Sequence, residues 1–469
     1  SAAQALVGKQ AENAQAHNLL GAVFETRKDA DAARAAYRRS VELAPDGRAG
    51  VLNIARMALI EGKIEEARQG FLRVIDKHAG DPTALLGLAK IASDAGNTAE
   101  SLELLERARS ANAKAIRPRL VLASYYLRQS MADKALKAAE EAIAISPQAP
   151  AIRVILGRAQ LAAKRGVDAI RTFTSLTKDF PDNAGVHFNL ALALRAQGRL
   201  DSARGALQRT LKLQPAFHAA RAALGQIELL TGNHAKALAI ADQLAADIPG
   251  AAAANSLRGD IYSSTQKQAQ AIDAYALTFK AAPSSATLSK LLIARQRAGQ
   301  TEQAREQAQG WLAEHPKDSV VRSLLAASSH ESGNVDQAVA DYEKVLEQNP
   351  DNVLVLNNLA WLYDARGDAR SIELAKRAYE LLPARAEIAD TYGWLLVKSG
   401  KVEQGLNLLD KAVEAAPGNA DIRYHHAATL HRAGESERAA SLLGKLLEEQ
   451  PEFSERGAAE QLLKELGKS

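Results

Sequence analysis

Apolar positions along this chain repeat every 34 or 33 residues, and a proline marks the end of most periods. Counting back from Pro147 by the same period reaches Ala113, Ala79 and Pro45, so the frame continues where a proline is missing. A proline has no N–H and cannot continue a helix, which places each one just after a helix end. The marking prolines are Pro147, Pro181, Pro215, Pro249, Pro283, Pro316, Pro350, Pro383, Pro417 and Pro451.

Each period predicts two amphipathic helices that approach closely, because one position in each helix carries a small side chain. A larger side chain there would push the helices apart. In the first helix the position holds Gly21, Ala55, Ala89, Ala123, Gly157, Ala191, Gly225, Gly259, Ala326, Ala360, Gly393 and Ala427, and only Ile293 departs. In the second helix it holds Ala33, Ala67, Ala135, Ala169, Ala203, Ala237, Ala271, Ala304, Ala338 and Ala439, with Ser101, Ile372 and Gly405 as exceptions.

A glycine between the two helices indicates where the first helix ends in a left-handed residue. Asp, Gln or Ser residues after the prolines, as in Pro181-Asp182-Asn183, predict the cap of the next helix. Each repeat is therefore delimited at both of its turns. The glycines are Gly62, Gly96, Gly198, Gly232, Gly299, Gly333, Gly367, Gly400 and Gly434.

These signals predict thirteen repeats within residues 14–453. Residues 1–13 look like the second helix of a repeat whose first helix is missing, so we expect the chain to be cut from a longer protein. Residues 454–469 predict one more amphipathic helix, a C-terminal cap. The repeats at Ala286 and Val353 are one residue short, which predicts tighter turns between their helices. The repeats begin near Ala14, Arg48, Pro82, Ile116, Pro150, Ala184, His218, Ala252, Ala286, Ser319, Val353, Ala386 and Ala420.

The whole pattern resembles the tetratricopeptide repeat (TPR), a helix–turn–helix unit of 34 residues with small, apolar and aromatic side chains at fixed positions. The resemblance covers nearly all of the chain. It implies an all-α fold, a right-handed superhelical solenoid without strands. It also implies that the protein presents a groove to other molecules and does not catalyse a reaction.

Composition supports helix and excludes several kinds of chemistry. Of 469 residues, 47% are apolar, 24% are charged and 4% are aromatic, and strong helix formers fill the chain. The net charge of +4 is too small a basic excess to indicate nucleic-acid binding. The chain has no Cys, which excludes disulfides, thiolate metal sites and Cys nucleophiles. No stretch approaches the roughly 20 apolar residues of a membrane span.

No set of catalytic or cofactor-binding residues occurs in this sequence at the spacing of a known motif. We find no nucleophile with a base, no paired carboxylates and no Gly-rich phosphate loop after a strand, and so expect no enzyme activity and no cofactor. The densest His cluster is His425, His426 and His431. Adjacent helical residues point about 100° apart, so we expect no metal site there.

In the TPR family, positions 2, 5, 9, 12 and 13 of the first helix line the groove. At these positions the second to sixth repeats carry six cations against Asp94 alone, which predicts a basic stretch for an acidic peptide or an anionic polysaccharide. The alternative is that long polar side chains simply solvate this face. The six cations, here called the basic stretch, are Arg56, Lys90, Arg117, Arg128, Arg158 and Arg195.

The last three repeats carry a different set at the same positions. Trp361 and Trp394 share a position in adjacent repeats, and such amphipathic rings commonly anchor partners. We therefore expect a second contact site there, separate from the basic stretch. Its candidate residues are Asn357, Trp361, Asp364, Asp390, Trp394, Tyr424 and His431, with Glu387, Lys398, Asp421 and Arg432 beside them. No repeat has the Lys and Asn pair of the chaperone-binding TPR clamp, so we expect no chaperone adaptor of that type.

Residues 357–443, from NNLAWLYDARGDARS to HRAGESERAASLL, resemble the C-terminal region of bacterial TPR lipoproteins of the exosortase/PEP-CTERM system. TPR scaffolds of alginate, cellulose and Pel export look alike at this level. The resemblance implies a periplasmic protein held at the outer membrane by an N-terminal lipidated Cys, and a scaffold role in exopolysaccharide export or surface-protein sorting. Two alternatives stay open, a cytoplasmic TPR adaptor and a regulatory subunit of a glycosyltransferase.

Overall fold

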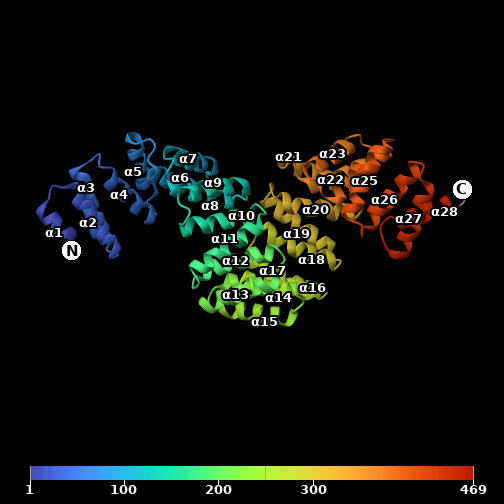
Figure 1. Ribbon diagram of the computed structural model, residues 1–469, viewed down its shortest axis with the longest axis horizontal. Coiled ribbons are helices and arrows are strands. Elements are labelled where there is room, and N and C mark those ends of the chain that lie inside the picture. Colours follow the sequence, from blue (N-terminus) through green and yellow to red (C-terminus); the bar gives the residue numbers. More distant parts are fainter. Residues whose placement is uncertain (1, 249, 468–469) are drawn as a thin grey trace. The chain divides into compact units, whose positions relative to one another are not determined.

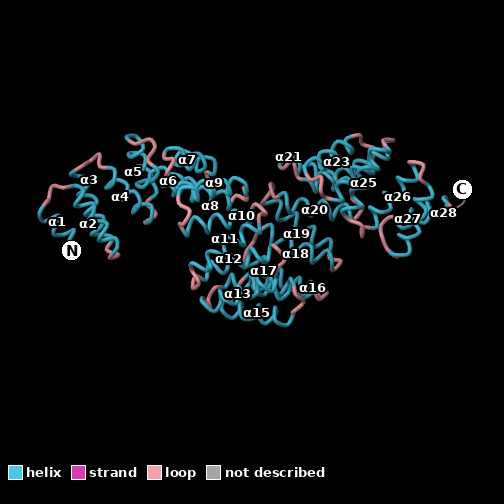
Figure 2. The backbone as a smooth tube through the Cα atoms, viewed as in Figure 1, coloured by secondary structure: helices cyan, strands magenta, loops and turns pink. Residues whose placement is uncertain are grey.

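The computed structural model describes residues 2–248 and 250–467. All regular secondary structure within these residues is helical, as the tube in Figure 2 shows, which confirms the predicted all-α class. The chain divides into an N-terminal unit, residues 1–237, and a C-terminal unit, residues 238–469. The boundary between the units falls inside helix α15, and each unit is described by itself.

The N-terminal unit stacks its helices in chain order, and from α1 to α14 each packs against the next (Figure 1). Its helices are α1 (Ala2–Lys9), α2 (Ala14–Thr26), α3 (Ala30–Leu43), α4 (Arg48–Ile60), α5 (Ile64–Lys77), α6 (Pro82–Asp94), α7 (Thr98–Ala111), α8 (Ile116–Arg128), α9 (Ala132–Ile145), α10 (Pro150–Ala162), α11 (Gly166–Asp179), α12 (Ala184–Ala196), α13 (Leu200–Leu213), α14 (His218–Leu230) and the start of α15 (His234–Asp247).

The C-terminal unit is built in the same way from the rest of α15 onward. Its helices are α16 (Ala252–Ser264), α17 (Gln268–Ala281), α18 (Ser285–Arg297), α19 (Thr301–Glu314), α20 (Ser319–Glu331), α21 (Val335–Gln348), α22 (Val353–Ala365), α23 (Arg370–Leu381), α24 (Ala386–Lys398), α25 (Val402–Ala415), α26 (Ala420–Arg432), α27 (Ser436–Glu449) and α28 (Arg456–Leu466).

The even-numbered helices from α2 to α26 begin at the residues predicted as repeat starts, except that α18 begins at Ser285 instead of Ala286. The prediction of tighter turns in the two short repeats is wrong. The turn 298–300 after α18 has the usual three residues, and the missing residue is in the connection 282–284 before it. The turn 366–369 is longer than usual, and α23 is shortened to 12 residues.

The predicted small positions of the first helices are buried against the second helix of the same repeat. At Gly157, an added Cβ would lie 2.6 Å from the Phe173 ring, and at Gly259 it would lie 2.4 Å from the Tyr275 ring. A side chain at either glycine would therefore occupy the volume of an aromatic ring. The packing explains why hydrogen is the only side chain that fits there.

Two of the predicted small positions carry large side chains, Ile372 and Ile293, and each has its own explanation. The repeat at Val353 is one residue short, so its buried position lies four residues after Gly367 instead of five; Ser371 is buried at 5% exposure and Ile372 is only half-buried. The extended start of α18 likewise moves the position from Ile293 to Leu292, which is buried. Leu292 fits because the facing helix carries Ala308, a residue of the same core cluster, where the repeats of Gly21, Gly157 and Gly259 carry a ring.

The glycines predicted between the helices adopt positive φ angles, from 69° at Gly367 to 91° at Gly434. In four other repeats the same turn position is occupied by a residue with a side chain. Lys28, Ser130, Lys164 and Gln266 have φ between 58° and 61°. An L-residue is strained in this left-handed region, so these turns cost free energy that the glycine turns do not.

First helices of neighbouring repeats also contact one another, as α8 with α10 and α10 with α12 in the N-terminal unit, and α22 with α24 and α24 with α26 in the C-terminal unit. These even-numbered helices therefore form a shared face in each unit. The last helix, α28, buries Ala459 against Ala427 and Leu443. No helix within residues 2–248 and 250–467 has the length and apolarity needed to cross a bilayer.

We predict opposite effects for two Gly→Ala substitutions in the N-terminal unit. Gly157→Ala should lower stability by about 1–3 kcal/mol, because the methyl group overlaps the Phe173 ring. Gly205→Ala, in α13 with no atom near its added Cβ, should raise stability by about 0.5–1 kcal/mol through helix propensity. Thermal unfolding of the two variants beside the parent tests both signs, and equal midpoints would contradict the assigned packing.

A second prediction concerns the strained turns. Lys164→Gly should stabilise the protein by roughly 0.5–1 kcal/mol, because glycine adopts positive φ without steric conflict. Gly198→Ala, the reverse change in the next repeat, should destabilise it by about 1 kcal/mol although open space surrounds the new methyl group. Urea unfolding monitored by circular dichroism measures both. A loss of stability in Lys164→Gly would show that the lysine side chain supports this turn.

Candidate partner-binding surfaces

The basic stretch lies on even-numbered helices of the N-terminal unit, but part of its charge is compensated within the protein. Arg56 on α4 donates to Glu25 on α2, with 2.5 Å between Nη2 and Oε2. Tyr37 donates to the same carboxylate oxygen at 2.7 Å. Burial alone would raise the pKa of Glu25, but the bonds from Arg56 and Tyr37 hold it below its usual value. Arg56 is therefore half of an internal ion pair.

Two more members of the basic stretch also have partners. Lys90 on α6 forms an ion pair with Asp94 one turn later, 2.9 Å between Nζ and Oδ2. Arg195 on α12 donates to the side-chain oxygen of Gln226 at 2.6 Å, which satisfies the guanidinium without neutralising it. Only part of the predicted positive charge therefore faces solvent uncompensated.

The remaining three cations concentrate on two neighbouring helices. Arg117 and Arg128 lie on α8 and Arg158 lies on α10, and all three are exposed. Within the described part of the chain, no carboxylate forms an ion pair with any of them. Because α8 contacts α10, the strongest positive potential of this face belongs to these two helices. We call Arg117, Arg128 and Arg158 the open arginines.

A cavity of about 370 Å³ lies beside one open arginine, between α6, α7 and α8. Lys90, Asp94 and Arg128 border it, and Leu86 and Val121 belong to its apolar wall. The cavity combines two cations with one carboxylate, so its border carries a net positive charge. Its size and charge suit an acidic side chain with an apolar stem.

The candidate residues of the second site surround a ring that the sequence analysis did not assign to this site. His425 on α26 stacks on Trp394 of α24, with 4.5 Å between ring centroids and an interplanar angle of 18°. Trp361 of α22 also stacks toward His425, at 5.8 Å and 27°, and Tyr424 lies 5.7 Å away. We call Trp361, Trp394, Tyr424 and His425 the aromatic cluster. It joins three successive first helices.

Polar contacts with Asp390 and Thr391 hold the rings of the aromatic cluster in place. Asp390 is buried and both of its carboxylate oxygens lie within 3.0 Å of Nδ1 of His425. Trp361 donates from Nε1 to the Thr391 hydroxyl at 2.8 Å. Asp390 was predicted as a contact residue, whereas the structure uses it to hold His425. His425 does not occupy one of the five groove positions of the first helix. The signal in the sequence for its pairing with Asp390 was their spacing of 35 residues.

The other candidates of the second site have separate environments. Asp364 forms an ion pair with Lys398, and His431 lies 3.0 Å from the Ser436 hydroxyl. The Arg432 guanidinium stands over the Trp394 ring at 5.4 Å from its centroid. Oδ1 of Asn357 is buried and has no hydrogen-bond partner among the described residues. Oδ1 of Asp421, beside the set, is likewise buried without a hydrogen-bond partner among the described residues.

The two adjacent histidines point to different carboxylates, as expected for neighbours on a helix. His425 meets Asp390 and His426 meets Asp410, with 2.9 Å between Nε2 and Oδ1 in the second pair. Neither carboxylate is shared. Across residues 2–248 and 250–467, no three His, Asp or Glu side chains gather in a way that could hold a metal ion.

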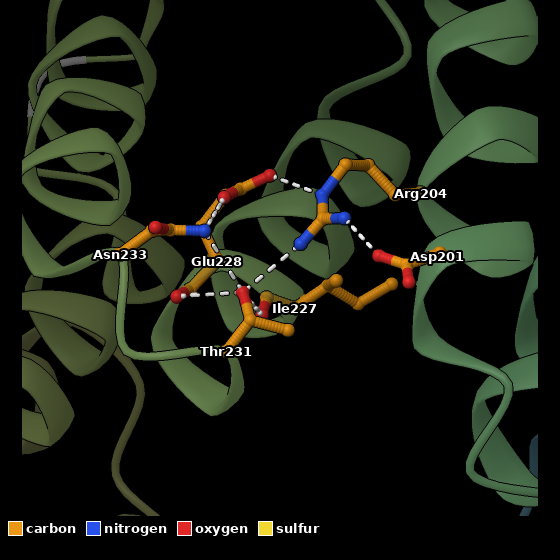
Figure 3. Close-up of polar contacts among 6 residues, drawn as sticks. All are labelled: Asp201, Arg204, Ile227, Glu228, Thr231 and Asn233. Carbon is orange, nitrogen blue, oxygen red and sulfur yellow. Dashed lines mark hydrogen bonds and ion pairs between the residues drawn. The ribbon is translucent and has the colours of Figure 1, made fainter.

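A polar network joins α13 to α14, and Figure 3 shows it. Arg204 donates to buried Glu228 at 2.7 Å, to Asp201 and to Thr231, while Asn233 also donates to Glu228. The network therefore ties the turn 231–233 to the preceding repeat.

Comparison with known families finds the same repeat in most of the chain. Four family models described as tetratricopeptide repeat match it. The matched residues are 1–48, 52–116 and 188–252 for one model, 126–193 and 396–463 for another, and 341–373 and 322–352 for the remaining two.

Curated relatives include two proteins named cellulose synthase operon protein C. The one from Xanthomonas axonopodis pv. citri (strain 306) is 30% identical over 193 residues, which is 40% of this chain and 11% of the relative. The one from Pseudomonas fluorescens (strain SBW25) is 25% identical over 198 residues, which is 41% of this chain and 13% of the relative. The chain thus spans a small part of either relative.

Solved structures that align with the chain include two complexes. The APC/C hetero-tetramer Cut9-Hcn1 aligns at 13% identity with a TM-score of 0.45, covering 96% of this chain and 95% of that chain. Naa15/Naa10 bound to HypK-THB aligns at 17% identity with a TM-score of 0.30, covering 85% and 68%.

The contacts of the aromatic cluster predict a large effect of His425→Ala. The substitution leaves the Asp390 carboxylate buried without its partner, and we expect a loss of about 3 kcal/mol. The double variant Asp390→Asn with His425→Ala should be less destabilised than the single variant, because no carboxylate is stranded. Urea unfolding followed by tryptophan fluorescence tests this. A double variant at least as unstable as the single one would refute the pairing.

Proposed function

Because the chain is a tetratricopeptide-repeat protein, we propose that it is a non-enzymatic scaffold of the bacterial envelope that binds protein components of exopolysaccharide synthesis and export. One observation carries the setting, the 30% identity with cellulose synthase operon protein C over 40% of this chain. The contacts between successive first helices, α8 with α10 and α10 with α12, and α22 with α24 and α24 with α26, support the scaffold role, since they bring several repeats together on one face.

The charge distribution supports an acidic partner on the N-terminal unit. The open arginines have no internal carboxylate to satisfy them, and the cavity between α6, α7 and α8 offers Arg128 and Lys90 to a side chain. Such exposed contacts are individually weak, at roughly 0–1 kcal/mol each. Binding therefore depends on several of them acting together, as an acidic peptide segment or an anionic polysaccharide would require.

The aromatic cluster supports a second, less charged contact on the C-terminal unit. Trp361 and Trp394 are half-buried, and their rings are held in place by His425 and Thr391. A partner that covers their exposed parts meets a rigid apolar surface, so little side-chain entropy is lost on binding. We therefore place a salt-independent contact there.

We further propose that the scaffold acts in the periplasm, attached to the outer membrane through a lipidated Cys upstream of this chain. The proposal rests on the sequence resemblance to exosortase-system lipoproteins. The same resemblance also implies a role in surface-protein sorting. The natural N-terminus tests it directly. A signal peptide ending in a lipobox Cys supports the periplasmic scaffold, and its absence supports the cytoplasmic adaptor or the glycosyltransferase subunit.

We predict that reversing the open arginines abolishes partner binding. In the triple variant Arg117→Glu, Arg128→Glu, Arg158→Glu, the affinity for a partner cross-linked and captured from envelope extracts should fall at least about tenfold at 0.15 M salt. High salt should weaken the parent in the same way, since screening strengthens with ionic strength.

The matched control is Lys137→Glu, Arg171→Glu, Lys178→Glu, which makes the same charge change on exposed positions of α9 and α11. It should bind like the parent, because these odd-numbered helices do not carry the shared face. The basic surface is excluded as the contact if the α8 and α10 variant keeps the parent's affinity at every salt concentration. The envelope scaffold is excluded if the captured proteins have no part in exopolysaccharide synthesis or export.

A further inference from the structure

The aromatic cluster of the C-terminal unit has polar atoms that the protein leaves without partners. Trp361 uses its Nε1 to bond Thr391, but Nε1 of Trp394 donates to no described residue. The hydroxyl of Tyr424 likewise has no hydrogen-bond partner in the described part of the chain. Neither atom is buried, so both reach solvent. A ligand on these rings therefore meets one N–H donor and one hydroxyl.

Two more polar side chains border the same rings. Asn357 precedes Trp361 by four residues on α22. Asp421 precedes His425 by four residues on α26. Side chains at this spacing are neighbours on one face of a helix.

Each of these two side chains keeps one group open to a ligand. The NH₂ group of Asn357 and Oδ2 of Asp421 reach solvent, and neither bonds to a residue that the structure describes. One is a donor and the other an acceptor. With the pair on the rings they make four groups, here called the free polar groups: those of Asn357, Trp394, Asp421 and Tyr424.

The charges around the cluster do not favour one sign. Asp364 and Glu387 form ion pairs within the protein. Asp390 is buried against the histidine of the cluster. Asp421 and Arg432 form no ion pair with a described residue, but their charges are opposite. This surface therefore differs from the open arginines, where all the uncompensated charge is positive.

A ligand that satisfies such a surface has polar groups that both donate and accept beside an apolar body. A sugar ring has this form, since it carries several hydroxyls at its edge and C–H groups on its faces. An apolar protein surface would cover the rings but would strip water from the free polar groups without replacing its bonds, which weakens binding. A charged polymer would find no matching field of opposite sign.

We infer that the aromatic cluster and the free polar groups bind a segment of an uncharged polysaccharide chain. The cluster joins three successive first helices, and packed helices lie about 8–10 Å apart, so the site spans several sugar units. The inference rests on the proposed function, which places the chain among components of exopolysaccharide synthesis and export. It deepens that function, because the polymer itself contacts the C-terminal unit while the acidic partner contacts the N-terminal unit.

Isothermal titration of the full chain with hexasaccharides tests the class of ligand. The neutral probes are cellohexaose, maltohexaose, laminarihexaose and mannohexaose, and the charged probes are hexamers of alginate and of glucosamine. We expect at least one neutral probe to bind with a Kd below about 1 mM. Its affinity should stay unchanged between about 0.05 and 0.5 M salt, and the charged probes should bind more weakly.

The key variant is Trp394→Phe with Tyr424→Phe, which keeps both rings and removes two of the free polar groups. We expect its affinity for the neutral probe to fall about tenfold. Tyr262→Phe on α16 is the matched control, because its hydroxyl also has no partner among the described residues. It should bind like the parent. Thermal unfolding shows whether each variant is folded.

Substitutions of Asp421 separate a neutral ligand from a cationic one. Asp421→Asn keeps an oxygen acceptor and removes the charge, so a neutral glycan should bind it nearly as well as the parent. Asp421→Ala removes the acceptor and should weaken the same glycan several-fold. A cationic ligand would instead lose affinity in both variants.

Four results would overturn the inference. None of the neutral probes binds at about 1 mM. A neutral probe binds, but the double Phe variant keeps the parent's affinity. Only a charged probe binds, and salt releases it. Peptides selected on the chain from a random phage library bind in place of the glycans and lose affinity in the double Phe variant, which would assign the site to a protein partner.

The inference and the proposed function can fail separately. The α8 and α10 triple variant should keep its glycan affinity, because its substitutions lie in the other unit. If no glycan binds while the proteins captured from envelope extracts belong to exopolysaccharide synthesis or export, the scaffold stands and the glycan site alone is excluded.

Discussion

The close approach of two helices at one small residue is the contact on which the rest of each unit depends. Gly157 under the Phe173 ring and Gly259 under the Tyr275 ring show how it is made, a residue without a side chain facing a large planar one. The contact sets the distance between the helices of a pair. That distance in turn decides how the next pair stacks and where the even-numbered helices meet along their shared face.

Sequence reasoning recovered this framework well, because its signals are local. Helix ends follow from residues within one turn, such as a glycine with positive φ, and the small positions repeat with the period. The prediction of the buried positions failed where two such local signals conflict. The residue missing from the repeat at Val353 puts Ser371 in the place assigned to Ile372, and no local pattern shows whether the turn or the helix has lost it.

The candidate sites were harder to predict, because a side chain's role depends on groups from other repeats. Arg56 is predicted as a contact for an acidic partner, and the sequence pattern does not show that Glu25 of the preceding repeat lies 2.5 Å from it. Asp390 was read as a groove residue, but it lies under His425 of the following repeat. Arg117, Arg128 and Arg158 kept their expected exposure because no carboxylate from a neighbouring repeat reaches them. Charge counted along a sequence therefore overestimates the charge that a partner meets.

The exchange of sizes between Leu292 and Ala308 bears on how such arrays change in evolution. In the repeats of Gly21, Gly157 and Gly259 the first helix is small and the second carries a large ring at this contact, and here the order is reversed within one pair. A helix transferred alone between these two kinds of repeat would create either a collision or a void. The hairpin, and not the single helix, is therefore the smallest piece that duplication, deletion or recombination can move intact.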